Sequence, residues 1–135
     1  MSIDLNLNIY PTAGQLERAT SQRVRALYSQ KYGHQPSKVD CHLLGNKVII
    51  SLEDVITPIE KLLVETASSS LVKQVRSFID EAIKPQLQEL VAETFQVNVT
   101  DCLYDTAIDT GCSGAIVILA DVPQVRRPKS FYKKK

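Results

Sequence analysis

A stripe of apolar residues at helical spacing in the second half of the chain most constrains its fold. Its members recur every three or four residues: Leu71, Val72, Val75, Phe78, Ile79, Ala82, Ile83, Leu87, Leu90, Val91 and Phe95. This period predicts one long amphipathic helix, whose apolar side must be covered by another layer. Pro85 removes one backbone hydrogen bond inside the pattern. Because the stripe continues in register, we expect a single helix with a kink near Glu81.

The sequence ITPIEKLLVE, residues 56–65, predicts a shorter helix just before the long one. Thr57 is a candidate N-cap, Pro58 fits the first helical position, and Glu60 can reach back to the backbone of the cap. Together they form a capping box worth about 1 kcal/mol. This structural role explains Glu60 without catalysis. The helix should run to about Thr66, and three side chains should face the core: Ile59, Leu62 and Leu63.

A third helix is predicted near the N-terminus, from Thr12 to about Tyr32, with Gly33 as its stop signal. Its expected inward face is formed by Leu16, Ala19, Arg23, Ala26 and Leu27, with Tyr28 as a further candidate.

Two pairs of strands are predicted. One pair lies between the N-terminal helix and the two later helices, and the other pair follows the long helix. A period of two on either side of Gly45-Asn46 predicts a hairpin whose inward residues are Val39, Cys41, Leu43, Val48, Ile50 and Leu52. Later, Val97, Val99 and Leu103 should share one face, opposite Cys102 and Tyr104. A loop over residues 105–114 and a strand over 115–120, apolar on both faces and ended by Pro123, complete the second pair.

The order α-ββ-α-α-ββ predicts an α+β fold: a two-layer sandwich with helices on one face of a four-stranded, mostly antiparallel sheet. We divide the chain into an N-terminal extension (1–11), a single domain (12–122) and a basic C-terminal tail (123–135). The long helix and the last strand offer more apolar surface than one small sheet needs to cover, which favours a homodimer.

Composition places the protein among soluble cytoplasmic domains. Of its 135 residues, 44% are apolar, which is enough for a core. No run of residues predicts a signal peptide or a transmembrane segment. Three cysteines without CxxC spacing favour reduced thiols.

Charge is unevenly distributed along the chain. Residues 1–121 hold 10 basic and 15 acidic residues, and no acidic residue follows Asp121. The tail is a candidate binding segment for a nucleic acid, an anionic membrane surface or an acidic partner. The alternatives are a solvated tail and one that folds back on its own acidic body. Its six basic residues are Arg126, Arg127, Lys129, Lys133, Lys134 and Lys135.

The sequence predicts no metal site, no cofactor and no catalytic residue. His34 and His42 have no partners at ligand spacing, and no glycine-rich phosphate loop occurs. Asp101, Asp105 and Asp109 fit a polar hairpin loop better than a cation site. Cys112, in TGCSG, is the candidate nucleophile of an alternative thiol enzyme, although an idle thiol is the simpler interpretation.

Lys73 and Arg76 are the other candidate binding residues. They lie three apart in the first turns of the long helix, where positive charge opposes the helix dipole. They could line a site for an anion or a partner. We favour surface ion pairs with Glu60, Glu65 or Glu81, each worth under about 1 kcal/mol.

The succession of motifs resembles a family of small bacterial proteins labelled MpsC-like. It comprises a Gly-x-x-Pro turn (Gly33, Pro36), a hairpin, the TPIEK stretch (Thr57, Pro58, Glu60) and LVKQVR with a later Glu and Pro (Glu81, Pro85). His34-Gln35 and the basic tail depart from the family pattern. The resemblance implies a small soluble protein that works with partners and is associated with membrane-potential generation or cation and inorganic-carbon transport.

We therefore expect a non-catalytic binding or regulatory module that acts through an unknown protein partner. Two alternatives remain open, a nucleic-acid or anionic-surface binder that uses the tail, and a thiol enzyme that uses Cys112.

Overall fold

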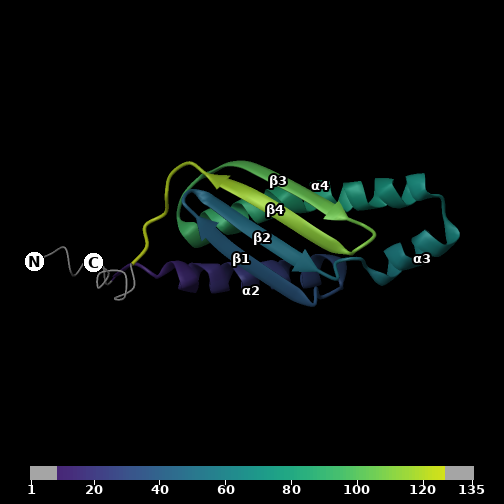
Figure 1. The fold of residues 1–135 in the computed structure, drawn as a ribbon, viewed down its shortest axis with the longest axis horizontal. Helices are drawn as coiled ribbons and strands as arrows, with labels where there is room; N and C mark the ends of the chain where they lie inside the picture. The colour runs from purple at the N-terminus through teal and green to yellow at the C-terminus, as the bar shows by residue number, and fades with distance from the viewer. Residues whose placement is uncertain (1–8, 127–135) are drawn as a thin grey trace, which may run out of the picture.

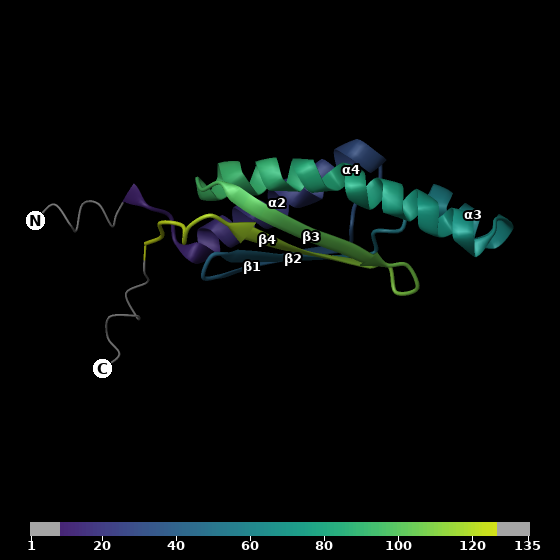
Figure 2. The ribbon, with the colours of Figure 1, turned by 90° about the horizontal axis from the view of Figure 1, so that it is seen from above.

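A computed structural model describes residues 9–126 and confirms the predicted α+β class and element order (Figure 1). Four antiparallel strands form one sheet in the order β1-β2-β4-β3. The helices lie on one face of this sheet (Figure 2). The elements are α2 (Ala13–Tyr32), β1 (Lys38–Leu44), β2 (Lys47–Glu53), α3 (Pro58–Thr66), α4 (Ser69–Phe95), β3 (Val99–Ala107) and β4 (Cys112–Leu119).

The first hairpin has the predicted turn and register. Leu44 pairs with Lys47, so Gly45 and Asn46 form a two-residue loop in which Gly45 has a φ of 64°. The inward side chains of β1 and β2 are buried except for Leu43, which is half-buried. These strands form one side of the core.

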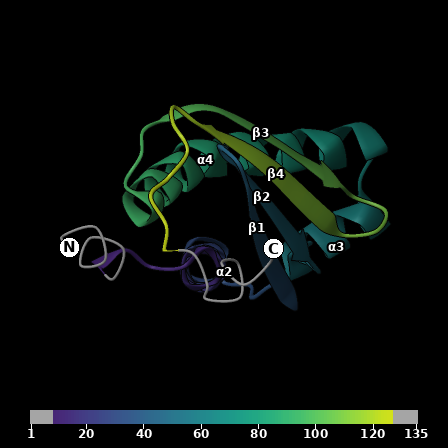
Figure 3. The ribbon, with the colours of Figure 1, turned by 60° about the vertical axis from the view of Figure 1, so that its left-hand side comes forward.

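The core lies between the sheet and two helices. Helix α2 packs mainly over β1 and α4 mainly over β3, and the two helices contact each other (Figure 3). Val24, Val48 and Leu87 are fully buried there. The uncovered face of the sheet is lined by the alternate residues of the same strands.

Helix α2 has the predicted ends but a different inward face. Thr12 and Gln15 form a capping box, and Gly33 ends the helix with a φ of 63°. The buried residues are spaced four apart: Leu16, Thr20, Val24 and Tyr28. The predicted face was wrong at Arg23 and Ala26, which are exposed. Thr20 can occupy the core because its hydroxyl donates to the carbonyl of Leu16, at 2.7 Å.

Helix α4 is a single helix that contains Pro85, as predicted, and Figure 2 shows it bending along its length. Its C-terminal half buries the predicted apolar residues from Ile83 to Phe95, whereas Ala82 is exposed. In its N-terminal half Val72 is buried as predicted, but the other buried positions are Arg76 and Asp80, and Phe78 is 83% exposed. Helix α3 and this half of α4 project beyond the end of the sheet (Figure 1), so no strand covers their outer sides.

Helix α3 also differs from the prediction. Ile59 and Leu62 are exposed and Leu63 is half-buried, so the expected apolar inward face was wrong. The buried residue of α3 is Glu60.

The second hairpin is longer and more regular than predicted. Strand β3 continues to Ala107 and β4 begins at Cys112, so only four residues form the turn instead of the predicted loop 105–114. A register shift between Val99 and Asp101 places Val99 on the core side with Cys102 and Tyr104. The prediction that Val99 shares a face with Leu103 was wrong because this bulge reverses the alternation.

Candidate functional site

Four buried polar side chains form a cluster at the point where α2, α3 and α4 meet. We call Tyr28, Glu60, Arg76 and Asp80 the buried ion cluster. Arg76 is 2% exposed and Glu60 3% exposed. The guanidinium of Arg76 binds both carboxylate oxygens of Glu60, with Nε donating to Oε2 at 2.8 Å and Nη2 donating to Oε1. This two-point contact is the strongest geometry that an arginine and a carboxylate can adopt.

Glu60 serves the helix start and the ion pair together. Its Oε1 accepts hydrogen bonds from the backbone N–H of Thr57 at 3.0 Å and from the Thr57 hydroxyl at 2.9 Å. The predicted capping box is therefore confirmed. The same carboxylate attaches α3 to α4 through Arg76.

The other donors of Arg76 are also occupied. Nη2 donates to the carbonyl of Val55 at 3.1 Å and to the hydroxyl of Tyr28 at 3.2 Å, and that hydroxyl donates to Val55 at 2.6 Å. Nη1 donates to Oδ1 of Asp80 at 3.3 Å. Arg76 thus connects α4 with α3, with the β2–α3 link and with α2.

Asp80 extends the cluster to the sheet. Its Oδ1 also accepts from the hydroxyl of Thr106 at 2.9 Å, and Thr106 shares a hydrogen bond with Ser113 at 2.6 Å. These two hydroxyls lie opposite each other on β3 and β4.

Burial and pairing act against each other on these groups. Burial disfavours the charge on Glu60, but the hydrogen bonds from Arg76 and Thr57 outweigh it and lower its pKa. Burial likewise opposes the charge on Arg76, and Glu60 overcomes it, so the pKa of Arg76 is raised. For Asp80, burial prevails over the contacts with Thr106 and Arg76, and its pKa is raised. Glu60 and Arg76 are therefore held as a charged pair.

The cluster corrects the expected role of Arg76. Its predicted pairing with Glu60 occurs, but in the interior and not at the surface. Val72, Arg76 and Asp80 are spaced four apart and in phase with the buried Ile83 and Leu87. That phase was visible in the sequence and marks Arg76 and Asp80 as inward-facing.

A pocket of about 410 Å³, the side pocket, lies between α4 and the end of β3. Lys73 is exposed at this pocket, and Arg76 and Asp80 form part of its wall. Tyr104 also lines it. The hydroxyl of Tyr104 is buried without a hydrogen-bond partner among residues 9–126, and burial raises its pKa.

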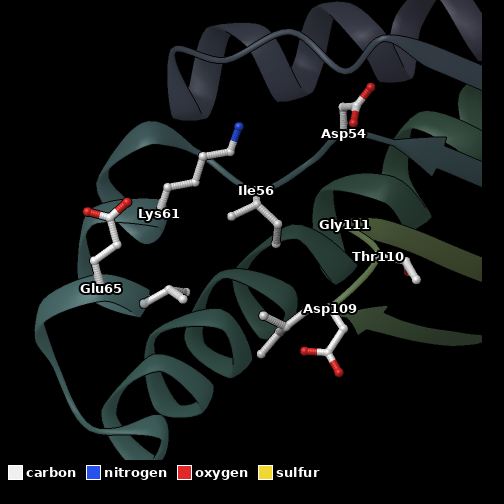
Figure 4. Close-up of a pocket in the computed structure, with 9 residues that line it drawn as sticks. Asp54, Ile56, Lys61, Glu65, Asp109, Thr110 and Gly111 are labelled. Atoms are coloured by element: carbon white, nitrogen blue, oxygen red, sulfur yellow. The ribbon is translucent and has the colours of Figure 1, made fainter.

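A second hollow of about 440 Å³, the end groove, lies on the other side of the β3–β4 turn (Figure 4). It is formed by α3, the β2–α3 link and the turn itself. Its apolar lining is Ile56, Val64 and Ile108. In Figure 4 the labelled Ile56 lies among charged residues of three separate segments: Asp54, Lys61, Glu65 and Asp109.

Helices α3 and α4 carry several large apolar side chains that the fold leaves exposed. We call Ile59, Leu62, Leu71 and Phe78 the hairpin surface, because they lie on two consecutive helices joined by a short link. Ile59 and Leu62 are three residues apart, and Leu71 and Phe78 are seven apart, so each pair shares one side of its helix.

The remaining predicted residues are dispersed. Gly33 ends α2, Pro36 is buried with its carbonyl accepting from Arg25 at 3.0 Å, and Pro85 lies within α4. In the tail, Arg126 lies beside Thr12 and donates its backbone N–H to Pro11 at 2.7 Å. Its Nε is buried without a partner in the described part of the chain. The other basic tail residues lie outside the described residues: Arg127, Lys129, Lys133, Lys134 and Lys135.

The cysteines are all free and lie apart from the buried ion cluster. Cys41 is buried, which raises the pKa of its thiol to about 12, and Cys102 is half-buried. Cys112 is exposed at the start of β4, where its thiol contacts the carbonyl of Thr110 at 3.9 Å. Over residues 9–126, no three His, Cys, Asp or Glu side chains gather as a metal site.

Comparison with known proteins gives one match. No curated protein and no solved structure matches the chain. None of the helices in the described region has the length and apolar character needed to cross a membrane. A family model described as "Na+-translocating membrane potential-generating system (MpsC)" matches residues 12–121. This match covers the helices and strands from α2 to β4, and the chain belongs to the MpsC family.

Proposed function

We propose that the protein is a non-catalytic docking module that binds a protein partner through the hairpin surface and thereby serves a membrane-potential-generating system. The observation that carries this proposal is the exposure of Ile59, Leu62, Leu71 and Phe78 on helices that project beyond the sheet. Each of the two helices carries a pair of them on one side, and exposed large apolar side chains of this kind are typical of interaction sites.

The buried ion cluster supports this role by fixing the shape of the docking element. Helix α3 buries no large apolar residue, so apolar packing contributes little to holding it in place. The two-point contact between Glu60 and Arg76 fixes α3 on α4 instead. A surface whose geometry is fixed before binding loses less entropy when the partner arrives.

The contacts of the charged groups also support a non-catalytic role. Glu60 is 3% exposed and both of its oxygens accept hydrogen bonds from Arg76 or Thr57, so this carboxylate is not accessible to a substrate. Among the residues that the structure describes, the thiol of Cys112 contacts a backbone carbonyl and neither a base nor a cation. A thiol without such a neighbour is a weak nucleophile at neutral pH.

The module is proposed to act as a homodimer that pairs through the uncovered face of the sheet. Ile49, Ile116 and Leu103 lie side by side across β2, β4 and β3 on that face. Leu103 is 59% exposed, and Ile116 is 39% exposed. A cross-strand apolar row is suited to stacking against the same row of a second copy, about 10 Å away.

Photo-crosslinking in the cells that make the protein tests the docking proposal. The variant Phe78→p-benzoylphenylalanine places a reactive aromatic group at the exposed position, and Glu89→p-benzoylphenylalanine is the matched control on the same helix. We expect position 78 to give one adduct with a protein of a membrane ion-transport system, and position 89 to give none. Equal labelling at both positions, or no adduct at position 78, would contradict the proposal.

The homodimer is tested separately by light scattering at micromolar concentration. We expect the mass of two chains for the wild type, and the mass of one chain after Leu103→Lys and Ile116→Lys together. A single monodisperse monomer in the wild type would contradict it.

A further inference from the structure

The end groove has the chemistry of a site for an aromatic segment that carries positive charge. Its walls offer apolar area from Ile56, Val64 and Ile108. Its rim carries the carboxylates of Asp54, Glu65 and Asp109 against the single ammonium of Lys61, a net charge of −2. An apolar ligand with flanking cations would be complementary in both respects.

The C-terminal tail of this chain has that composition. Residues 127–135 read RPKSFYKKK, with five basic residues, no acidic residue, and the aromatic pair Phe131-Tyr132 between them. The described part of the chain ends at Arg126, so the pair begins five residues beyond it.

The length of the tail decides which copy of the groove it can reach. Arg126 lies beside Thr12, at the N-terminal end of α2. The groove lies near the opposite end of α2, where His34 Nε2 donates to the carbonyl of Asp54 at 2.7 Å. The 20 residues of α2 separate these points by about 30 Å. Six extended residues span at most about 22 Å, so Tyr132 does not reach the groove of its own chain.

We propose that the end groove binds the Phe131-Tyr132 segment of a second copy of this chain. The aromatic pair packs against Ile56, Val64 and Ile108, and the flanking lysines face the carboxylates of the rim. This site is separate from the hairpin surface, because Val64 and Leu62 lie on different sides of α3. The basic tail of one copy thus has its binding site on another copy of the same protein.

Crosslinking between isotopically distinct copies tests the proposal with the full chain. Tyr132→p-benzoylphenylalanine is prepared at natural abundance, mixed with uniformly ¹⁵N-labelled wild type and irradiated, and the adducts are mapped by mass spectrometry. We expect adducts that join one unlabelled and one labelled chain and that map to residues 54–65 or 107–111. Raising the salt from 0.05 M to 0.5 M should lower their yield several-fold, because the contact is partly ionic.

Two substitutions on α3 supply a matched pair, since both residues are more than half exposed and both variants should fold. Val64→Lys removes apolar wall area and adds a like charge, and should lower the adduct yield about tenfold. Leu62→Lys makes the same chemical change outside the groove and should leave the yield unchanged, while it weakens docking at the hairpin surface. The two proposals therefore fail independently.

Four results would overturn the proposal, of which three concern the adducts that form. These are adducts confined to single chains, adducts that map outside the groove, and a yield that Val64→Lys leaves unchanged in a folded variant. The absence of any adduct between copies would overturn it as well.

Discussion

Replacing Arg76 by methionine tests most severely whether the buried ion cluster holds the helices together. The variant keeps an unbranched side chain of similar helix propensity, but it removes every hydrogen bond that the guanidinium makes to Glu60, Asp80, Tyr28 and Val55. Glu60 would remain buried with its charge unpaired, and Asp80 would lose its cationic neighbour.

The expected loss follows from the burial of the pair. Removing one partner of a buried ion pair costs about 3–5 kcal/mol, because the other charge remains in the interior without compensation. For a chain of 135 residues, the unfolding entropy is about 0.28 kcal/mol/K, so this loss lowers Tm by about 11–18 °C. Thermal and urea unfolding followed by circular dichroism at pH 7 measure both quantities.

Lys73→Met on the same helix is the matched control, since Lys73 is exposed and makes no ion pair among the described residues. It should change stability by less than about 0.5 kcal/mol. The double variant Glu60→Gln with Arg76→Met should be more stable than the sum of the single losses by about 1–3 kcal/mol. If Arg76→Met costs no more than Lys73→Met, the cluster does not hold α3 and α4 together and our reasoning fails.

Three further predictions concern single groups. Because the pKa of Glu60 is lowered, the stability that its charge contributes is complete above the ordinary glutamate pKa of about 4.3 and is lost as the pH falls through the lowered value. The difference in unfolding free energy between wild type and Glu60→Gln should therefore shrink from pH 7 to pH 3 in urea titrations. An equal difference at both pH values would contradict the assignment. Tyr28→Phe should cost about 1–2 kcal/mol in the same assay, because it removes the hydroxyl that donates to Val55 and accepts from Arg76; a neutral effect would indicate that these contacts are replaceable. Phe78→Ser should leave Tm within about 2 °C of the wild type, because this ring is exposed; a large drop would show that Phe78 packs within the fold.

The fold was accessible from the sequence because its signals are local. The turn at Gly45-Asn46, the stop at Gly33 and the capping box at Thr57 each depend on residues within a few positions of one another. The long helix was recognised through Pro85 because the apolar stripe kept its phase. The bulge between Val99 and Asp101 was missed because the strand has no glycine or proline there to mark it.

The candidate sites were less accessible because they depend on contacts between distant segments. Arg76 joins residues 16, 21 and 48 positions away, and no local pattern shows that it would find so many acceptors. The assumption that apolar residues of a helix face inward also assigned Ile59 and Phe78 to the core, whereas the inward positions of this part of α3 and α4 are mostly polar. Polar residues that are in phase with a buried apolar stripe, such as Arg76 and Asp80, should therefore be predicted to face inward.

The two proposed contacts use opposite sides of α3. We propose that the hairpin surface binds a protein partner and that the end groove binds the tail of another copy. Because the buried ion cluster supports the same short helix, loosening it should weaken both contacts together. Arg76→Met is therefore expected to reduce crosslinking at position 78 and at position 132 even at temperatures where the variant remains folded.

The most direct test of a non-catalytic docking role is a measurement of membrane potential with a potential-sensitive dye. The cells lack their own copy of the protein and are supplied with one of three versions of it. We predict that wild type and Cys112→Ala restore the potential lost on deletion, and that Leu62→Lys with Phe78→Ser does not, although it accumulates to the same folded level. Restoration by the Leu62 and Phe78 variant, failure of Cys112→Ala, or a deletion that leaves the potential unchanged would contradict the account.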